Sequence, residues 1–173
     1  MQRAVGARPL GSAGTALFRS VLGHYPTGVV LVTAPQGDAG GPPPAMIVGT
    51  FTSVSLNPPL VGFLPSLTSS SWPLIRAAGR FCVSVLAADQ RHVCRAFVAR
   101  DPARWDLPHR LAPSGSPVVT GALAWIDCEM AGESPAGDHW FVTGLVRHLA
   151  VQRRGAPLLF LRGDFAAGGS LPG

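Results

Sequence analysis

Glycine and proline interrupt the apolar runs of this chain so often that they restrict it to short elements. The 173 residues include 21 glycines and 17 prolines, which end helices and strands and favour turns. No apolar run reaches the length of a membrane span. A chain of this length suits one domain with a sizeable core. The sequence therefore predicts a single domain of short strands and turns, without a membrane partner.

The apolar runs between these turns predict the order of the elements. Helices are expected at 15–22, 72–79 and 88–99, the last with Asp89 as a possible N-cap. The expected strands are 26–34, 45–56, 59–64, 80–87, 117–130, 139–152 and 156–165, with a wide hairpin connection at 35–44 and an irregular segment at 100–117. Many short strands with few helices are typical of a β-barrel or sandwich.

The positive charge of the chain is carried by arginine. The sequence holds 14 arginines and no lysine, and its net charge is +5. The absence of lysine excludes Schiff-base chemistry on a lysine amine. The scattered arginines are suited to an anion such as a phosphate, a dinucleotide or an acidic protein face. No basic run is interleaved with aromatic residues, so nucleic acid is not expected as a partner.

Cysteine usage and the N-terminal sequence indicate where the protein works. Cys82, Cys94 and Cys128 form no CxxC pair, and their odd number disfavours a zinc site or a disulfide framework. We therefore expect no metal and expect buried thiols in the apolar runs. Residues 1–16 have no apolar core of signal-peptide length. A reducing, cytoplasmic setting is expected.

The stretch MIVGTFTSVSLNPPLVGF (46–63) carries hydroxyls on both faces of a predicted strand. Thr50 and Thr52 fall on one face, and Ser53 and Ser55 fall on the other. One interpretation is ordinary strand composition, because threonine favours strands and serine is tolerated near their ends. The other is a ligand with many polar atoms lying across the strand end, where Gly49 lets the backbone approach a flat ring.

Two further polar clusters are candidates for binding or chemistry. The hydroxyls of 68–71 precede a helix start at Trp72 and Pro73, where they either bind an anion or include a simple N-cap, Ser71. The segment AGDHWFVTG (136–144) places His139 in an accessible polar turn, although a lone histidine is more often structural. A nucleophile elbow, a GxGxxG motif and a P-loop are all absent from the sequence.

Five segments occur in an order that matches a known family. They are FRSVLGHYPTGV (18–29), MIVGTFTSVSLNPPLV (46–61), SSSWPLIRAAGRFCVSVL (69–86), AGDHWFVTG (136–144) and PLLFLRG (157–163). Together they resemble the flavin reductase-like family with an FMN-binding split β-barrel, the reductase component of two-component flavin-dependent monooxygenases. The resemblance covers residues 15–165, and we expect 1–14 and 166–173 to be tails.

The resemblance implies a fold, an activity and partners. The fold would be a mainly β, antiparallel split β-barrel with a few short helices, assembled as a homodimer with FMN or FAD at its interface. NADH or NADPH would pass a hydride to the flavin, and the reduced flavin would leave for a transient partner, a flavin-dependent monooxygenase. In such a site the protein supplies position and electrostatics, while the flavin supplies the redox chemistry.

The resemblance also assigns roles to individual residues. His139 would contact the nicotinamide or the flavin edge, and Arg162 would approach the same site. The phosphate would be held by Thr68, Ser69 and Ser70. The residues expected along the isoalloxazine and ribityl chain are Pro26, Thr27, Val48, Gly49, Thr50, Ser53, Val54 and Ser55. The hydroxyls of Thr50, Ser53 and Ser55 would then pair with flavin and not with protein.

Some positions depart from the family pattern and leave alternatives open. Gly49 stands where Asn or Ser is common, and Leu67 and Thr68 stand where a basic residue is frequent. Trp140 replaces a smaller or polar residue, and it either closes the nicotinamide cleft or packs. The alternatives are a flavin-binding relative without reductase activity, acting as an oxidase, monooxygenase or accessory protein on an organic substrate in a biosynthetic pathway, and a barrel dimer that is only an interaction module.

Overall fold

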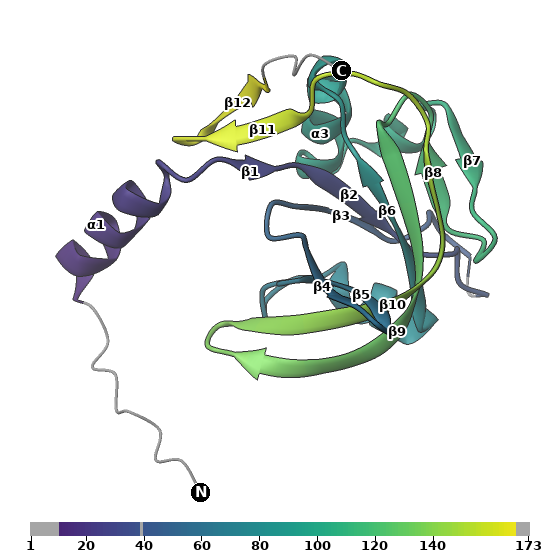
Figure 1. The fold of residues 1–173 in the computed structure, drawn as a ribbon, viewed down its shortest axis with the longest axis horizontal. Helices are drawn as coiled ribbons and strands as arrows, with labels where there is room; N and C mark the ends of the chain where they lie inside the picture. Colours follow the sequence, from purple (N-terminus) through teal and green to yellow (C-terminus); the bar gives the residue numbers. More distant parts are fainter. Residues whose placement is uncertain (1–10, 39, 169–173) are drawn as a thin grey trace, which may run out of the picture.

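The structure is a computed structural model that describes residues 11–38 and 40–168. Antiparallel strands dominate it, and the helices are few and short (Figure 1). The helices are α1 (Ser12–Leu22), α2 (Trp72–Ala78) and α3 (Arg91–Val98), with the 3-10 turns η1 (Ala88–Gln90) and η2 (Pro102–Trp105). Within the described ranges, none of these helices is both long and apolar enough to cross a membrane. The predicted mainly β, antiparallel architecture is confirmed.

A seven-stranded antiparallel sheet forms the body of the molecule. Its strands, in spatial order, are β3 (Ala45–Val48), β2 (Val30–Thr33), β6 (Arg80–Val85), β9 (Ala124–Ala136), β10 (His139–Val151), β5 (Pro59–Phe63) and β4 (Thr52–Leu56). Two small sheets flank it. They contain β1 (Thr27–Gly28), β11 (Leu158–Leu161) and β12 (Asp164–Ala167), and separately β7 (His109–Leu111) and β8 (Pro117–Val119).

The two edge strands of this sheet are consecutive in the chain. β3 ends at Val48 and β4 begins at Thr52, so three residues carry the chain from one edge to the other. Four Cα–Cα steps of about 3.8 Å allow at most about 15 Å between these two ends. The sheet must therefore curl back on itself, as Figure 1 shows. In the described part of the chain no ladder pairs β3 with β4, so the hydrogen-bonded sheet is open and is not a closed barrel.

The apolar core lies inside the curl of the sheet. Phe63 packs edge-to-face against Phe81 and Trp72, with ring centroids 5.3 Å and 5.7 Å apart, a preferred geometry for aromatic pairs. α2 contributes Trp72 and Ile75, both buried, and ends at Gly79 with φ 66°, the left-handed conformation that glycine adopts without strain. These contacts fix α2 against the sheet just after residues 66–71, the serine-rich loop.

A second cluster anchors α3 against the outer side of β2. Val93, Cys94 and Phe97 of α3 are buried together with Val29 and Leu31. Apolar residues recur on one face of this helix, which explains its orientation. The carboxyl end of α3 is thereby held close to β3, and it leads into Arg100 and η2.

Several predicted boundaries differ from the structure. The predicted strand 45–56 is broken at 49–51, because the chain must pass between the sheet edges there. The predicted strand 26–34 is divided at Val29, whose N–H donates to Leu158 O and whose carbonyl accepts from Leu86 N, outside both flanking ladders. Asp89 is not the cap of α3, because it lies within η1 and Gln90 takes the N-cap position. The Asp89 carboxylate instead pairs with Arg153.

The expected tails and the irregular segment are also more ordered than predicted. Residues 12–14 form the first turn of α1, since Ser, Ala and a single Gly do not prevent a helix. Ala166 and Ala167 pair with β11 as part of β12. Residues 1–10 and 169–173 lie outside the described residues. The segment 100–117 contains η2 and β7.

Candidate functional site

The hydroxyl-rich stretch is not a regular strand, which explains its hydroxyls on both faces. Ser53 pairs with Val61 and Ser55 pairs with Leu60, so Val54 is an extra residue in β4. Such a bulge interrupts the alternation of side chains and twists the strand locally. Val54 lies over β5, where a Cβ added to Gly62 would come within 2.9 Å of its side chain.

The hydroxyls of this stretch divide into two groups. The Thr50 hydroxyl accepts a hydrogen bond from Leu64 N at 2.9 Å, and the Thr52 hydroxyl donates to Ser53 O at 3.2 Å. Thr50 therefore ties the β3–β4 connection to the end of β5, whereas we expected its hydroxyl to be left for a flavin. In the described structure the Ser53 and Ser55 side chains have no protein hydrogen-bond partner.

The connection between β3 and β4 lies against β1. A Cβ added to Gly49 would stand 3.1 Å from Thr27 Oγ1 and 4.0 Å from Gly28 O. The structure thus brings together Thr27 and Gly49, which the sequence places 22 positions apart. Val48 is buried and Pro26 is exposed beside them. These residues meet where the chain crosses between the two sheet edges.

The serine-rich loop before α2 is held by its own hydroxyls. The Ser66 and Thr68 hydroxyls are 2.9 Å apart, and Ser66 Oγ also accepts from Thr68 N at 3.2 Å. Ser69 Oγ accepts from Trp72 N at 3.2 Å, so Ser69 and not Ser71 supplies the side-chain cap. Ser70 Oγ accepts from Arg100 Nη2 at 2.7 Å. Ser69 and Ser70 retain a hydroxyl proton for a further acceptor.

His139 lies beside this loop. An isolated bridge pairs it with Ser66, and the flanking bonds run from Trp140 N to Pro65 O at 2.9 Å and from Leu67 N to Asp138 O at 3.0 Å. His139 Nδ1 donates to Asp138 Oδ1 at 2.6 Å, because a carboxylate can only accept. This hydrogen bond, which is the largest cause, lowers the pKa of the Asp138 carboxyl. Nε2 of the half-exposed ring is left without a protein partner in the described structure.

Trp140 packs against a neighbouring arginine. The Arg76 guanidinium lies 5.6 Å from the centroid of the Trp140 ring and pairs with Glu133. A cation over an indole face is attracted by its quadrupole. Of the two readings left open by the sequence, this contact favours packing.

Arg162 stands apart from the serine-rich loop. It occupies the turn between β11 and β12 with φ 52°, and its N–H donates to Gly23 O at 2.8 Å. β11 pairs with β1, so Arg162 lies on the side of Thr27 and the end of α1. Within the described residues it forms no hydrogen bond or ion pair with the serine-rich loop or with His139.

A cavity of about 580 Å³ adjoins the serine-rich loop. Its walls are β3, the proline-rich connection that precedes it, the loop itself, and the end of α3 with η2. The lining residues include Met46, Ser69, Ser70, Phe97, Arg100 and Arg104. Sequence reasoning missed Arg100 and Arg104, because they lie 30 or more positions from the serines they face. The available signal was two arginines directly after an amphipathic helix.

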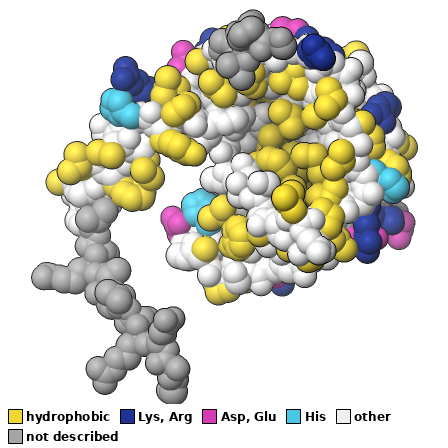
Figure 2. Space-filling model, in the orientation of Figure 1, with side chains coloured by type: hydrophobic (Ala, Val, Ile, Leu, Met, Phe, Trp, Pro, Cys, Tyr) yellow, Lys and Arg dark blue, Asp and Glu magenta, His cyan; other side chains and the backbone are white. Residues whose placement is uncertain are grey.

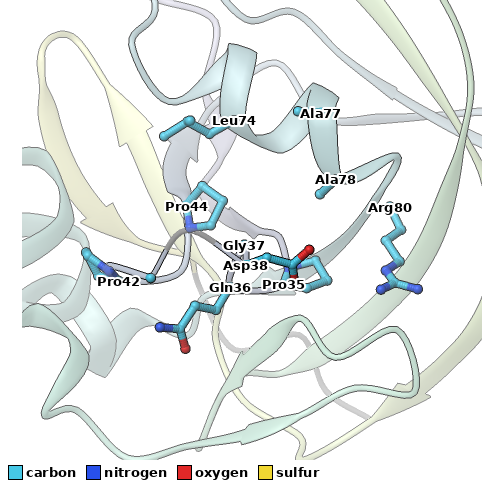
Figure 3. Close-up of a pocket in the computed structure, with 11 residues that line it drawn as sticks. Pro35, Gln36, Gly37, Asp38, Pro42, Pro44, Leu74, Ala77, Ala78 and Arg80 are labelled. Carbon is cyan, nitrogen blue, oxygen red and sulfur yellow. The ribbon is translucent and has the colours of Figure 1, made fainter.

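A smaller cavity of about 380 Å³ lies on the other side of the proline-rich connection. Figure 3 shows Asp38 on this connection and Arg80 at the start of β6 among its lining residues. Pro44 and Leu74 line both cavities. This smaller cavity contains none of the predicted site residues, and its lining includes the Asp38 carboxylate as well as the Arg80 guanidinium, so it is a poorer anion site.

The described part of the molecule holds three separate cysteines and no cluster of metal-ligating side chains. Cys82, Cys94 and Cys128 are buried and unbridged. Burial raises the pKa of Cys94 to about 11 and that of Cys128 to about 12. No three His, Cys, Asp or Glu side chains in the described ranges are grouped so that they could hold a metal ion.

Comparison with known proteins identifies relatives along most of the chain. The family described as flavin reductase like domain matches residues 22–169. The chain is 51% identical over 151 residues to a flavin reductase of Pseudomonas putida, covering 86% of each protein. It is 42% identical over 149 residues to the reductase subunit HsaB of a flavin-dependent monooxygenase from Rhodococcus jostii, covering 86% of this chain and 75% of the relative.

Solved structures share the fold. A nitrilotriacetate monooxygenase component B homologue from Mycobacterium thermoresistibile superposes with a TM-score of 0.84 at 38% identity, covering 90% of this chain and 87% of that one. The NADH:FAD oxidoreductase SgcE6 of Streptomyces globisporus, in complex with NAD and FAD fragments, gives a TM-score of 0.82 at 31% identity, covering 92% and 96%.

Proposed function

The chain belongs to the family of flavin reductase like domains, and from this premise we propose that it is an NAD(P)H:flavin oxidoreductase. It transfers a hydride from NADH or NADPH to FMN or FAD and supplies reduced flavin to a partner monooxygenase. The observation that carries the proposal is 51% identity to a flavin reductase over 86% of both chains. The HsaB relative, a reductase subunit of a flavin-dependent monooxygenase, supports the role of the partner.

The residues where the chain crosses between the sheet edges are suited to the flavin ring. Thr27 Oγ1 would lie 3.1 Å from a Cβ added to Gly49, so the two residues are close there, and Val48, Thr50 and Val54 extend the surface along the connection and β4. The hydroxyls of Ser53 and Ser55 are free of protein partners in the described structure, so they can bind the polar atoms of the ring and ribityl chain. A bound flavin would accept the hydride, and these residues would hold and orient it.

The serine-rich loop fits a phosphate. Ser69 and Ser70 each accept a bond from protein N–H and keep the hydroxyl proton, which can be donated to a phosphate oxygen. Thr68 lies between them and Ser66 in the same loop. The residues present therefore suit the phosphate end of FMN or FAD as well as its ring.

His139 is suited to orient the nicotinamide or the flavin edge. Asp138 fixes its Nδ1–H, which leaves Nε2 as a hydrogen-bond acceptor in the neutral ring. The bridge to Ser66 places it at the same loop as the phosphate residues. Arg162 is proposed to approach the ring from the side of β1, where its turn contacts the end of α1.

The proposed assembly is a homodimer of split β-barrels. The curled open sheet supports the split barrel. α1 stands away from the body and buries none of its residues (Figures 1 and 2). Its large apolar side chains are therefore exposed to solvent, each by more than half: Leu17, Phe18, Val21 and Leu22. A group of exposed apolar side chains on one helix is typical of an interaction site, and we infer that a second copy covers it.

The proposed setting is the cytoplasm. Three buried thiols without a disulfide in the described residues agree with a reducing compartment. Such a compartment also contains the reduced nicotinamide nucleotides that the reaction consumes.

The test is oxidation of NADH, and separately NADPH, with added FMN, FAD or riboflavin. We expect rapid flavin-dependent turnover by the wild type and a loss of about 10-fold or more in His139→Ala, the range for a residue that positions a reacting group. If the protein binds flavin but oxidises neither NADH nor NADPH with any added flavin, the reductase assignment is contradicted and bound-flavin chemistry on an organic substrate is favoured. A protein that binds no flavin would favour the interaction module.

A further inference from the structure

The lining of the 580 Å³ cavity is positively charged. The guanidinium groups of Arg100 and Arg104 line it, and no carboxylate does. The ion pairs in the described structure involve other arginines, so neither of these two is neutralised by a carboxylate there. Met46, Ile47 and Phe97 give the same cavity an apolar wall. A site with two unpaired cations, hydroxyl donors and an apolar wall suits a phosphate carried on an organic group.

Arg100 is held in a backbone conformation that arginine does not favour. Its φ is 54°, and it follows α3 at the position where the helix ends. Arg100 N donates to Phe97 O at 3.3 Å and Asp101 N donates to Ala96 O at 3.0 Å. These two bonds form a Schellman motif, whose left-handed residue is usually glycine. An arginine costs about 1 kcal/mol there, and such strain is often found at functional sites.

The strained backbone aims the side chain at the serine-rich loop. Arg100 Nη2 donates to Ser70 Oγ at 2.7 Å. The carbonyls of Arg100 and Asp101 accept from Arg104 Nη1 at 3.2 Å and 2.8 Å, so the second guanidinium is tied to the same turn. The cavity continues along β3, which leads directly into the residues proposed to bind the flavin ring.

We propose that Arg100, supported by Arg104, binds the phosphate group of the flavin and so sets the preference for FMN and FAD over riboflavin. The proposal rests on the proposed function for the identity of the ligand. Arg100 donates charge-assisted hydrogen bonds, and Ser69 and Ser70 add their hydroxyl protons. The positive charge thus reaches the serine-rich loop from the end of α3, since 66–71 contains no basic residue of its own.

The decisive variant is Arg100→Gly, because glycine suits the left-handed position and the fold is expected to be kept. Its matched control is Arg95→Gln, which removes the same charge from an exposed arginine of α3 that does not line the cavity. Dissociation constants for FMN, FAD and riboflavin are measured by quenching of flavin fluorescence, without nicotinamide. We expect FMN and FAD to bind about 10-fold or more weakly to Arg100→Gly, with riboflavin unchanged and the control like the wild type.

Other outcomes would overturn the assignment. These are equal weakening of FMN and riboflavin, an effect of the same size in Arg95→Gln, or no preference for FMN over riboflavin in the wild type. If Arg100→Gly raises the KM for NADPH and leaves FMN binding intact, the charge serves the nicotinamide nucleotide and the proposal is wrong. If the protein does not oxidise NADH or NADPH but still prefers FMN in an Arg100-dependent way, only the reductase function is contradicted. If the protein turns over but does not prefer FMN over riboflavin, only the role of Arg100 is contradicted.

Discussion

At the scale of single residues, Thr50 shows how one hydroxyl fixes the connection between the sheet edges. Its Oγ1 accepts from Leu64 N at 2.9 Å. Thr50→Val keeps the shape and removes this exposed hydrogen bond, so we expect a loss of about 0.5–1 kcal/mol in the free energy of unfolding, measured in urea. Thr52→Val is the control, because its exposed hydroxyl bonds only to Ser53 O, and we expect little change. Equal unfolding midpoints for Thr50→Val and wild type would contradict this role.

The buried thiols predict a pH dependence of stability. Burial raises the pKa of Cys94 to about 11 and of Cys128 to about 12, whereas an unfolded thiol has a pKa of about 8.5. Above that value the unfolded state loses protons that the folded state keeps, so stability is full below about pH 8.5 and falls as pH rises. We expect the urea midpoint to drop between pH 8 and pH 10, and to drop less in Cys128→Ala. The same slope in both proteins would be evidence against this cause.

Residues that act locally were predictable from sequence, and residues that meet across the fold were not. Gly79 and Pro73 marked the ends of α2 because their effect depends on their own backbone. Arg100 was missed, since its partner Ser70 lies 30 positions away and only the packing of α3 brings the two together. The roles of His139 and the serine-rich loop came from the family resemblance, and binding of flavin by them stays a prediction.

At the scale of elements, the β9–β10 hairpin depends on one close approach. A Cβ added to Gly144 would lie 2.3 Å from Cζ of the buried Phe81 and 3.1 Å from Cys128 Cβ. We expect Gly144→Ala to lower the free energy of unfolding by about 1–3 kcal/mol through overpacking, measured by urea unfolding. Gly132→Ala on the same hairpin would meet only Thr143 Oγ1 at 3.6 Å and is the control.

A second substitution tests the cause of this loss. If the Phe81 ring is responsible, Gly144→Ala should cost less in a Phe81→Leu background, and the double-mutant cycle will show coupling. Additive effects of the two substitutions would mean that the glycine is required for another reason.

Element types followed from the sequence better than element boundaries. The run 45–56 has strand composition on both sides of Gly49, so nothing local indicates a break. The break exists because β3 and β4 occupy opposite edges of one sheet, and edge positions depend on the pairing of every strand between them. Likewise Asp89 resembled a cap, but its carboxylate pairs with Arg153, an interaction between distant segments.

At the scale of the whole molecule, the exposed apolar face of α1 predicts the oligomeric state. We expect the wild type to have twice the mass of one chain by light scattering, and Phe18→Ser with Val21→Ser to shift it toward one chain. Leu149→Ser is the control, because Leu149 is an exposed apolar residue of β10. A wild type with the mass of one chain would rule out the homodimer.

The tether at 49–51 has a consequence for how the molecule fluctuates. Because β3 and β4 share this tether but no ladder, a ligand that immobilises it restrains both margins of the sheet together. When FMN is added, we expect the amide hydrogens of β3 and of β4 to exchange more slowly, and by a similar factor. Exchange is followed by mass spectrometry, with β7 as a reference that should not change. Slowing in one strand alone would show that the margins open independently. Joint slowing would mean that the two margins of the sheet are restrained together through residues 49–51.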